Sequence, residues 1–148
     1  MNDTEDEFGP VDIVVIGFPA DAPMTGESIP IFLDLVDSGI IRVLDALFVQ
    51  KDADGTFSGF DLADLNEDTA GDLTVFAGAT TGLLDSDDVA AAAAEIEPGT
   101  AAVMIVYENR WAARFVASVR RNGGQVIANE RISAQQLLDA LDAAEAAA

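Results

Sequence analysis

The stretch VDIVVIGF, residues Val11–Phe18, is rich in β-branched residues and is apolar at positions that face both sides of an extended chain. A strand with two apolar faces is typical of the buried centre of a sheet. Residues 100–107, TAAVMIVY, repeat this pattern in the second half of the chain. We therefore predict that these two stretches form two central strands.

A helix and a more polar strand are predicted after each of these stretches. A helix that Thr25 or Ser28 caps and Gly39 ends leads to a strand at Ile41–Lys51. A helix within residues 110–122, which Gly123 and Gly124 end, leads to a strand at residues 125–132. Two strand–helix–strand units, 11–51 and 100–132, predict a ferredoxin-like α+β sandwich of the split βαβ type, with the first strand of each unit central and the second outside. A flavodoxin-like sheet is the alternative, but it needs more strands and a phosphate-binding loop after the first strand, which residues 18–23 do not supply.

The rest of the chain is expected to complete a single domain at residues 10–148, behind an acidic lead-in at residues 1–9. A helical insertion is predicted at about residues 61–98, and its last helix is expected to be capped by Ser86. Ser133 and Gln136 predict a capping box for a final helix that ends near Ala147. Within the 110–122 helix, Trp111, Phe115 and Val119 have the spacing of a core stripe, and Asn109 is expected to be its cap.

Residues 50–61, QKDADGTFSGFD, resemble a calcium-binding loop in part, because acids alternate and a glycine holds the sixth place. The first place is Gln50, however, and the twelfth is Asp61 rather than a longer glutamate. The flanking residues, including a short strand expected at 56–60, have the character of strands rather than helices. We therefore interpret the loop as a hairpin turn at residues 52–55, and no metal site or cofactor is predicted.

The composition excludes several classes of function. The net charge is −20, from 27 acidic and seven basic residues, and such a surface repels nucleic acids and anionic membranes. The chain contains no cysteine and no histidine, which excludes thiol nucleophiles, serine–histidine–aspartate triads and cysteine or histidine metal sites. Apolar runs too short for a bilayer and an acidic N-terminus favour a cytoplasmic protein. The acidity is consistent with either adaptation to high salt or an acidic protein from an ordinary habitat.

A basic helix that follows an apolar strand is the main candidate for a binding site. The tentative ligand- or partner-binding residues are Glu108, Arg110, Trp111 and Arg114. Arginines near a helix N-terminus oppose the helix dipole, so an acidic group is expected to compensate them. They could bind an anion, dock on the acidic surface of another subunit, or pair within the chain.

Three acids beside apolar strand residues, Asp12, Asp45 and Glu108, are weaker candidates for acid–base chemistry. Solvent is expected to reach Asp12 and Glu108 at strand ends, and Asp45 is expected to pair with Arg42. No catalytic residue is predicted.

Four segments carry a resemblance to a known family: GPVDIVVIGFP (9–19), SGIIRVLDALFVQKDADG (38–55), EPGTAAVMIVYENRWAARFVASVRRNGGQVIANERI (97–132) and LLDALDA (137–143). They resemble a family of short acidic prokaryotic proteins described only as a domain of unknown function. That family is similar to another uncharacterised group, sometimes described as stress-associated or membrane-linked. The resemblance implies a fold but no reaction and no catalytic residue.

The sequence thus favours a non-enzymatic domain that acts as a homo-oligomer or by binding a protein partner. The alternative is a small-molecule sensor, in which Arg110, Trp111 and Arg114 hold an anionic or aromatic ligand. An acid–base enzyme that uses Glu108 or Asp12 has less support.

Overall fold

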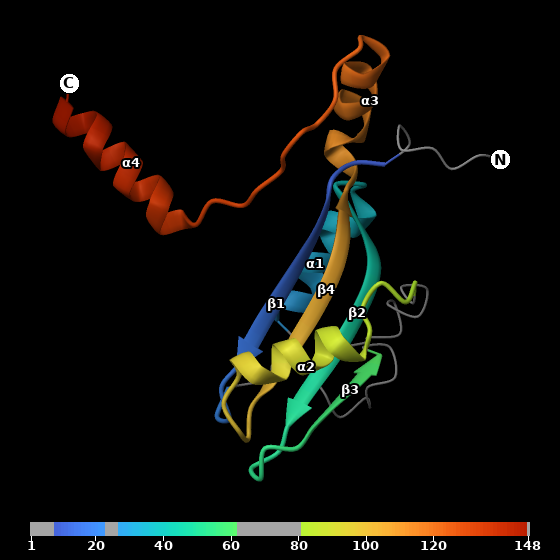
Figure 1. Cartoon of the computed structure of the whole chain (residues 1–148), viewed down its shortest axis with the longest axis vertical. Coiled ribbons are helices and arrows are strands. Elements are labelled where there is room, and N and C mark those ends of the chain that lie inside the picture. Colours follow the sequence, from blue (N-terminus) through green and yellow to red (C-terminus); the bar gives the residue numbers. More distant parts are fainter. Residues whose placement is uncertain (1–7, 23–26, 62–80, 148) are drawn as a thin grey trace.

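The computed structural model describes residues 8–22, 27–61 and 81–147, which form a mixed α+β structure (Figure 1). These described residues contain four strands, four helices and one 3₁₀ turn, η4. In chain order they are β1 (Val11–Phe18), α1 (Ser28–Asp37), β2 (Ile41–Lys51), β3 (Phe57–Asp61), α2 (Ser86–Glu95), β4 (Ala101–Asn109), η4 (Arg110–Ala112), α3 (Ala113–Arg121) and α4 (Ala134–Ala147).

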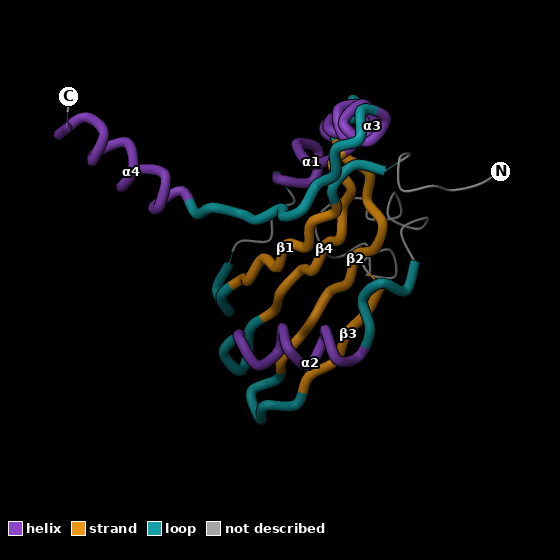
Figure 2. The backbone as a smooth tube through the Cα atoms, turned by 45° about the horizontal axis from the view of Figure 1, so that its top comes forward, coloured by secondary structure: helices purple, strands orange, loops and turns teal. Residues whose placement is uncertain are grey.

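The strands form one antiparallel sheet in the order β1-β4-β2-β3 (Figure 2). β4 lies between β1 and β2, and β3 returns beside β2 as the expected hairpin. A β-bulge between Val43 and Asp45 shifts the register of β2 against β4. The predicted centrality of β4 is therefore confirmed.

The helices α1 and α2 cover opposite faces of this sheet. On one face, Val89 and Ala93 of α2 belong to a core with Leu47, Val49, Met104 and Val106. On the other face, Ile29 and Phe32 of α1 pack around Ala46 of β2. An α+β sandwich of the expected type would place its helices on one face, so the ferredoxin-like arrangement is not confirmed.

The prediction that β1 is central and β2 peripheral is wrong. β1 is an edge strand, and four of its apolar side chains are exposed: Val11, Ile13, Val15 and Ile16. Among residues 8–22, 27–61 and 81–147, no strand pairs with the outer side of β1, and we call this side, with these four side chains, the open edge. β2 is buried instead, because it lies between β4 and β3 with α1 and α2 packed on its two faces. Its polar residues find partners inside the chain: Asp45 accepts the Leu84 N–H, and Arg42 pairs with Glu108. Polar residues in β2 thus mark buried contacts rather than a solvent-facing strand.

The predicted strand at residues 125–132 is also absent. After β4 the chain continues through η4 into α3, which stands beyond the end of the sheet, and residues 122–133 lead away to α4 (Figure 1). We call residues 122–147 the C-terminal arm. The predicted core stripe of α3 is wrong as well, since Trp111 and Phe115 are exposed and the buried residues are Ala112, Ala113 and Val116. Without a sheet beneath α3, large side chains on its outer side remain uncovered.

Several local predictions are confirmed. Gly39 follows α1, Gly123 follows α3, and both have the positive φ that favours glycine. Ser133 and Gln136 form the expected capping box before α4. The cap of α2 is Asp85 rather than Ser86, because the Asp85 carboxylate accepts the N–H groups of residues 87 and 88. The cap position of α1 is Glu27, so Ser28 is the first residue of the helix and not its cap. The alternative cap at Thr25 and most of the insertion, residues 62–80, lie outside the described residues.

Lys51 of β2 holds the C-terminal end of α2 to the sheet. Its ammonium group donates to the carbonyl oxygens of Ala93 and Ile96, at 2.9 and 3.1 Å. A cation at a helix C-terminus satisfies carbonyl groups that have no partner within the helix and stabilises the helix dipole. Asp85 and Lys51 therefore fix both ends of α2.

Candidate functional site

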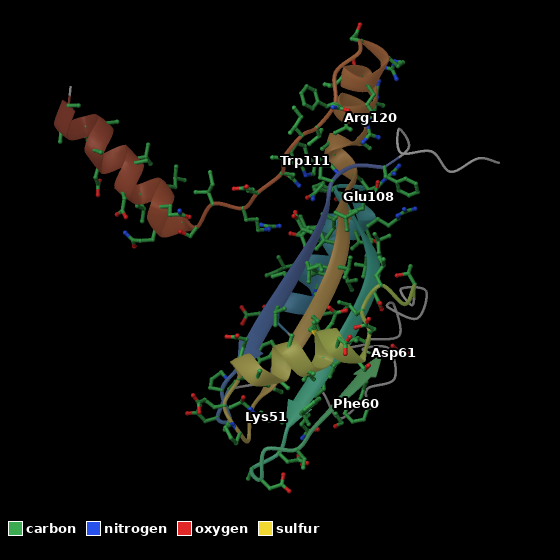
Figure 3. The ribbon with its side chains drawn as sticks, in the orientation of Figure 1. Lys51, Phe60, Asp61, Glu108, Trp111 and Arg120 are labelled. Carbon is green, nitrogen blue, oxygen red and sulfur yellow. The ribbon has the colours of Figure 1, made fainter. Side chains whose placement is uncertain are left out.

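Glu108, near the end of β4, is the buried centre of an ion cluster (Figure 3). Its side chain has 0% exposure. One carboxylate oxygen, Oε1, lies 3.0 Å from Arg42 Nε, and the other, Oε2, lies 3.1 Å from Arg110 Nη1. Oε2 also accepts the backbone N–H of Gly9 at 2.7 Å. The cluster thus joins the segment before β1, the start of β2 and the start of η4.

This geometry corrects two predictions. Solvent does not reach Glu108, and Arg42 pairs with Glu108 rather than with Asp45. The prediction that an acid compensates the arginines of the helix start is confirmed for Arg110. Two cations and a backbone N–H occupy the Glu108 carboxylate, so its contacts hold the fold together.

Gly9 contributes a close backbone approach to the same cluster. A Cβ atom at this position would lie 2.1 Å from the carbonyl oxygen of Asn109 and 3.2 Å from the backbone nitrogen of Ala113. Only glycine allows this approach, which delivers the Gly9 N–H to Glu108.

The remaining predicted site residues, Trp111 and Arg114, lie at the surface. Trp111 is 68% exposed, and its indole N–H donates to Asn109 Oδ1 at 3.3 Å. The structure therefore brings Glu108 and Arg110 into contact and leaves Trp111 and Arg114 outside that contact. That these residues bind an anionic or aromatic ligand stays a prediction.

A second polar cluster joins the C-terminal arm to the start of β1, and sequence reasoning did not find it. Arg131 Nη2 lies 2.8 Å from Asp12 Oδ2 and also donates to the Tyr107 hydroxyl. Asn109, expected to cap the helix, instead donates its amide to Asp12 Oδ2 and to the carbonyl of Pro10. These partners are up to 119 residues apart in the sequence, and no local pattern signals their pairing.

The C-terminal arm exposes apolar side chains along its length. Ile127 is 89% exposed, and four more exposed residues follow: Ile132, Leu137, Leu138 and Leu141. Its helix α4 carries three acidic residues and no basic one, whereas residues 110–121 carry four arginines and no acidic residue. The η4–α3 segment and α4 thus carry opposite charge, and each exposes apolar side chains.

A shallow groove of about 630 Å³ lies elsewhere, between β3 and α2. Phe57, Phe60 and Val89 are among its lining residues. Phe60 and Glu108 lie toward opposite ends of the sheet (Figure 3). The groove therefore includes none of the predicted site residues.

The predicted hairpin at residues 52–55 is confirmed. The N–H of Gly55 donates to the Asp52 carbonyl, and Gly55 has a φ of 89°. The Thr56 hydroxyl donates to Asp54 Oδ1 at 2.6 Å, and its oxygen also lies 3.2 Å from Asp52 Oδ2. The hydrogen bond from this hydroxyl to Asp54, with the one from the Thr56 N–H, lowers the pKa of Asp54. Among residues 8–22, 27–61 and 81–147, no group of three acids is placed to hold a metal ion.

The helices of the described part of the chain include none that is both long enough and apolar enough to cross a bilayer. None of the curated proteins and none of the solved structures matches the chain. One family model does match, and it covers residues 7–147, which include every strand and helix described above. The chain therefore belongs to a family of unknown function, DUF6325.

Proposed function

We propose that this protein is a non-catalytic self-association domain whose copies join along the open edge. The observation that carries this proposal is the contrast between the sequence of β1 and its position. β1 is apolar on both faces, as buried strands are, yet it lies at the edge of the sheet with Val11, Ile13, Val15 and Ile16 exposed.

An exposed edge strand with apolar side chains favours pairing with another chain, because its outward backbone groups are free to form a new ladder. Edge strands that remain single are usually protected by charges, prolines or bulges. The eight residues of β1 include one charged residue, Asp12, and no proline. Its features therefore favour association over protection.

The open edge alone supports only weak association. Burying the remaining exposed half of one of its side chains contributes about 1 kcal/mol, so the four contribute about 4 kcal/mol. Association costs at least about that much in lost translational and rotational freedom. A stable complex therefore needs further surface, and the chain has such surface on α3 and on the C-terminal arm.

The contacts of the two buried acids, Glu108 and Asp45, agree with a non-catalytic role. Glu108 is engaged by two arginines and a backbone N–H, and Asp45 accepts the N–H groups of Ala46 and Leu84. Both carboxylates thus stabilise the fold. The net charge of −20 on each copy opposes association at low ionic strength, and salt reduces that repulsion.

The test is multi-angle light scattering of the full chain at increasing protein concentration in high salt. We expect oligomers of the unchanged protein and a shift to monomer in Ile13→Lys,Val15→Lys, because two lysines on the open edge disfavour strand pairing. The matched control is Leu83→Lys, since Leu83 and Ile13 have nearly equal exposure, 57% and 56%. A protein that is monomeric at every concentration and salt level would refute self-association.

A further inference from the structure

We propose that two copies exchange their C-terminal arms, so that residues 125–132 of one copy pair with β1 of the other and α4 lies against the other copy's α3. This inference rests on the proposed self-association and specifies its geometry. Three observations carry it: a register between the arm and β1, a distance that prevents pairing within one chain, and the opposite charges of α3 and α4.

The register of the arm against β1 follows from two observations: the equal lengths of the two segments, and one ion pair between them. β1 has eight residues, as does the segment 125–132. Within one chain, Arg131 Nη2 lies 2.8 Å from Asp12 Oδ2. If Arg131 of the exchanged arm keeps Asp12 as its partner in the second copy, an antiparallel pairing places Ile127 opposite Ile16 and Ile132 opposite Val11. All eight residues of the segment then face all eight of β1, with no residue left over at either end.

The arm cannot pair in this way with β1 of its own chain while α3 keeps its position. α3 stands beyond the end of the sheet where β1 begins, so its last residue is far from Phe18, where the antiparallel segment would start (Figures 1 and 2). The distance from the C-terminal end of α3 to the C-terminal end of β1 is about 45 Å. It is the sum of the length of η4 and α3, about 20 Å, and the length of β1, about 26 Å. The connection from Arg121 to Gln125 reaches at most about 15 Å.

The position of α3 is fixed by packing and hydrogen bonds. Ala112, Ala113 and Val116 are buried. The N–H of Trp111 donates to the Ile40 carbonyl at 3.2 Å, and Gly9 packs closely against Ala113. Folding α3 back over the sheet would break these contacts, whereas an arm from a second copy reaches β1 without disturbing them.

The exchanged α4 would arrive beside the second copy's α3. A segment that runs antiparallel to β1 ends next to Val11, at the end of the sheet from which α3 rises (Figure 1). There, Leu137, Leu138 and Leu141 of α4 can cover Trp111 of η4 and Phe115 of α3, all of which are exposed in a single copy. The three acidic residues of α4 meet a helix with arginines, including Arg114 and Arg121.

Arm exchange also accounts for the sequence pattern. Adding residues 125–132 to β1 gives the strand order of a ferredoxin-like sheet, 4-1-3-2, with β3 as an additional outer strand. β1 then becomes a central strand, as its two apolar faces require, and the segment 125–132 becomes a strand contributed by the partner.

Cysteine cross-linking between copies tests this register, since the natural chain has no cysteine. A tagged Ile16→Cys protein is mixed with an untagged Ile127→Cys protein, unfolded, refolded together and oxidised. A second mixture pairs Val11→Cys with Ile132→Cys. Residues directly opposite in an antiparallel pair are within disulfide range. The controls use the same four variants in the crossed combinations, Val11→Cys with Ile127→Cys and Ile16→Cys with Ile132→Cys, which are five residues out of register.

We expect a tagged–untagged disulfide dimer in both matched mixtures and at least tenfold less in the crossed ones. The fluorescence of Trp111, the single tryptophan, is expected to shift to shorter wavelength in the dimer and not in Leu138→Asp. Equal cross-linking in matched and crossed mixtures, or a disulfide that forms only within a chain carrying Ile16→Cys and Ile127→Cys together, would overturn arm exchange. If light scattering shows oligomers while no matched disulfide forms, self-association stands and arm exchange fails. If the protein is monomeric throughout, both fail.

Discussion

Replacing Glu108 by glutamine tests whether one buried charge stabilises the contacts among the segment before β1, the start of β2 and the start of η4. The side chain keeps its size, and its amide oxygen can still accept the Gly9 N–H. The charge that binds Arg42 and Arg110 is lost. The amide N–H₂ group then faces a guanidinium group, and because both groups are hydrogen-bond donors, no hydrogen bond can form between them.

The expected loss of stability follows from the exposure of the partners. Removing one member of a fully buried ion pair typically costs about 3–5 kcal/mol, because the other charge stays buried without a partner. Here the Arg42 and Arg110 side chains are 48% and 41% exposed, so water can hydrate them once the carboxylate is gone. We therefore expect Glu108→Gln to lower the free energy of unfolding by about 2–3 kcal/mol.

Urea unfolding followed by far-ultraviolet circular dichroism measures this loss. With a slope of about 1–3 kcal/mol per molar urea, the midpoint should fall by about 0.7–3 M while the slope is unchanged. Glu97→Gln is the control, because it makes the same chemical change at an exposed position and should alter stability by less than about 0.5 kcal/mol. Both variants are compared at one low protein concentration, so that association contributes equally. A loss below 1 kcal/mol for Glu108→Gln would refute the structural role of the charge.

Four other changes have definite expected outcomes. Gly9→Ala should destabilise the fold by about 3 kcal/mol, because the new Cβ meets backbone atoms, while Gly17→Ala, whose Cβ has only an ordinary contact, should be nearly neutral in the same urea titration. Lys51→Met should cost about 1–2 kcal/mol, because α2 loses two charge-assisted hydrogen bonds at its C-terminal end; equal stability of Lys51→Met and the unchanged protein would contradict that role. Raising the salt from 0.01 M to 1 M should strengthen self-association measured by light scattering, since the screening length falls from about 30 Å to about 3 Å, and an oligomer that weakens with salt would count against this reasoning. Millimolar calcium should raise the melting temperature no more than magnesium does; a larger calcium effect would show that the 50–61 loop is more than a hairpin.

The local elements of this fold could be predicted from the sequence, because their signals lie within a few residues of one another. The glycines after α1 and α3, the Ser133 capping box and the 52–55 turn are examples. Strand order could not be predicted in the same way. Apolar residues on both faces of β1 indicated burial, yet within one copy the strand lies at the edge. The apolar pattern of a strand predicts that its faces are buried, but it does not predict which segment, or which copy of the chain, buries them.

The site was predicted only in part, for a related reason. Glu108 and Arg110 lie two residues apart, and their pairing follows from the unfavourable position of an arginine at a helix start. Arg42 and Gly9, the other partners of Glu108, are 66 and 99 residues away in the chain. Polar residues of β2 suggested solvent contact, although Asp45 and Arg42 in fact satisfy distant buried groups.

The single lysine of the chain has a consequence for chemical labelling. Because the Lys51 ammonium donates to two carbonyl groups at the end of α2, a reagent that needs the free amine can react only when these hydrogen bonds open. The rate of acylation at Lys51 is therefore a natural probe of how often α2 detaches from the sheet, without any engineered label. Acylation would remove the positive charge, so one modified side chain would leave the end of α2 without its cation.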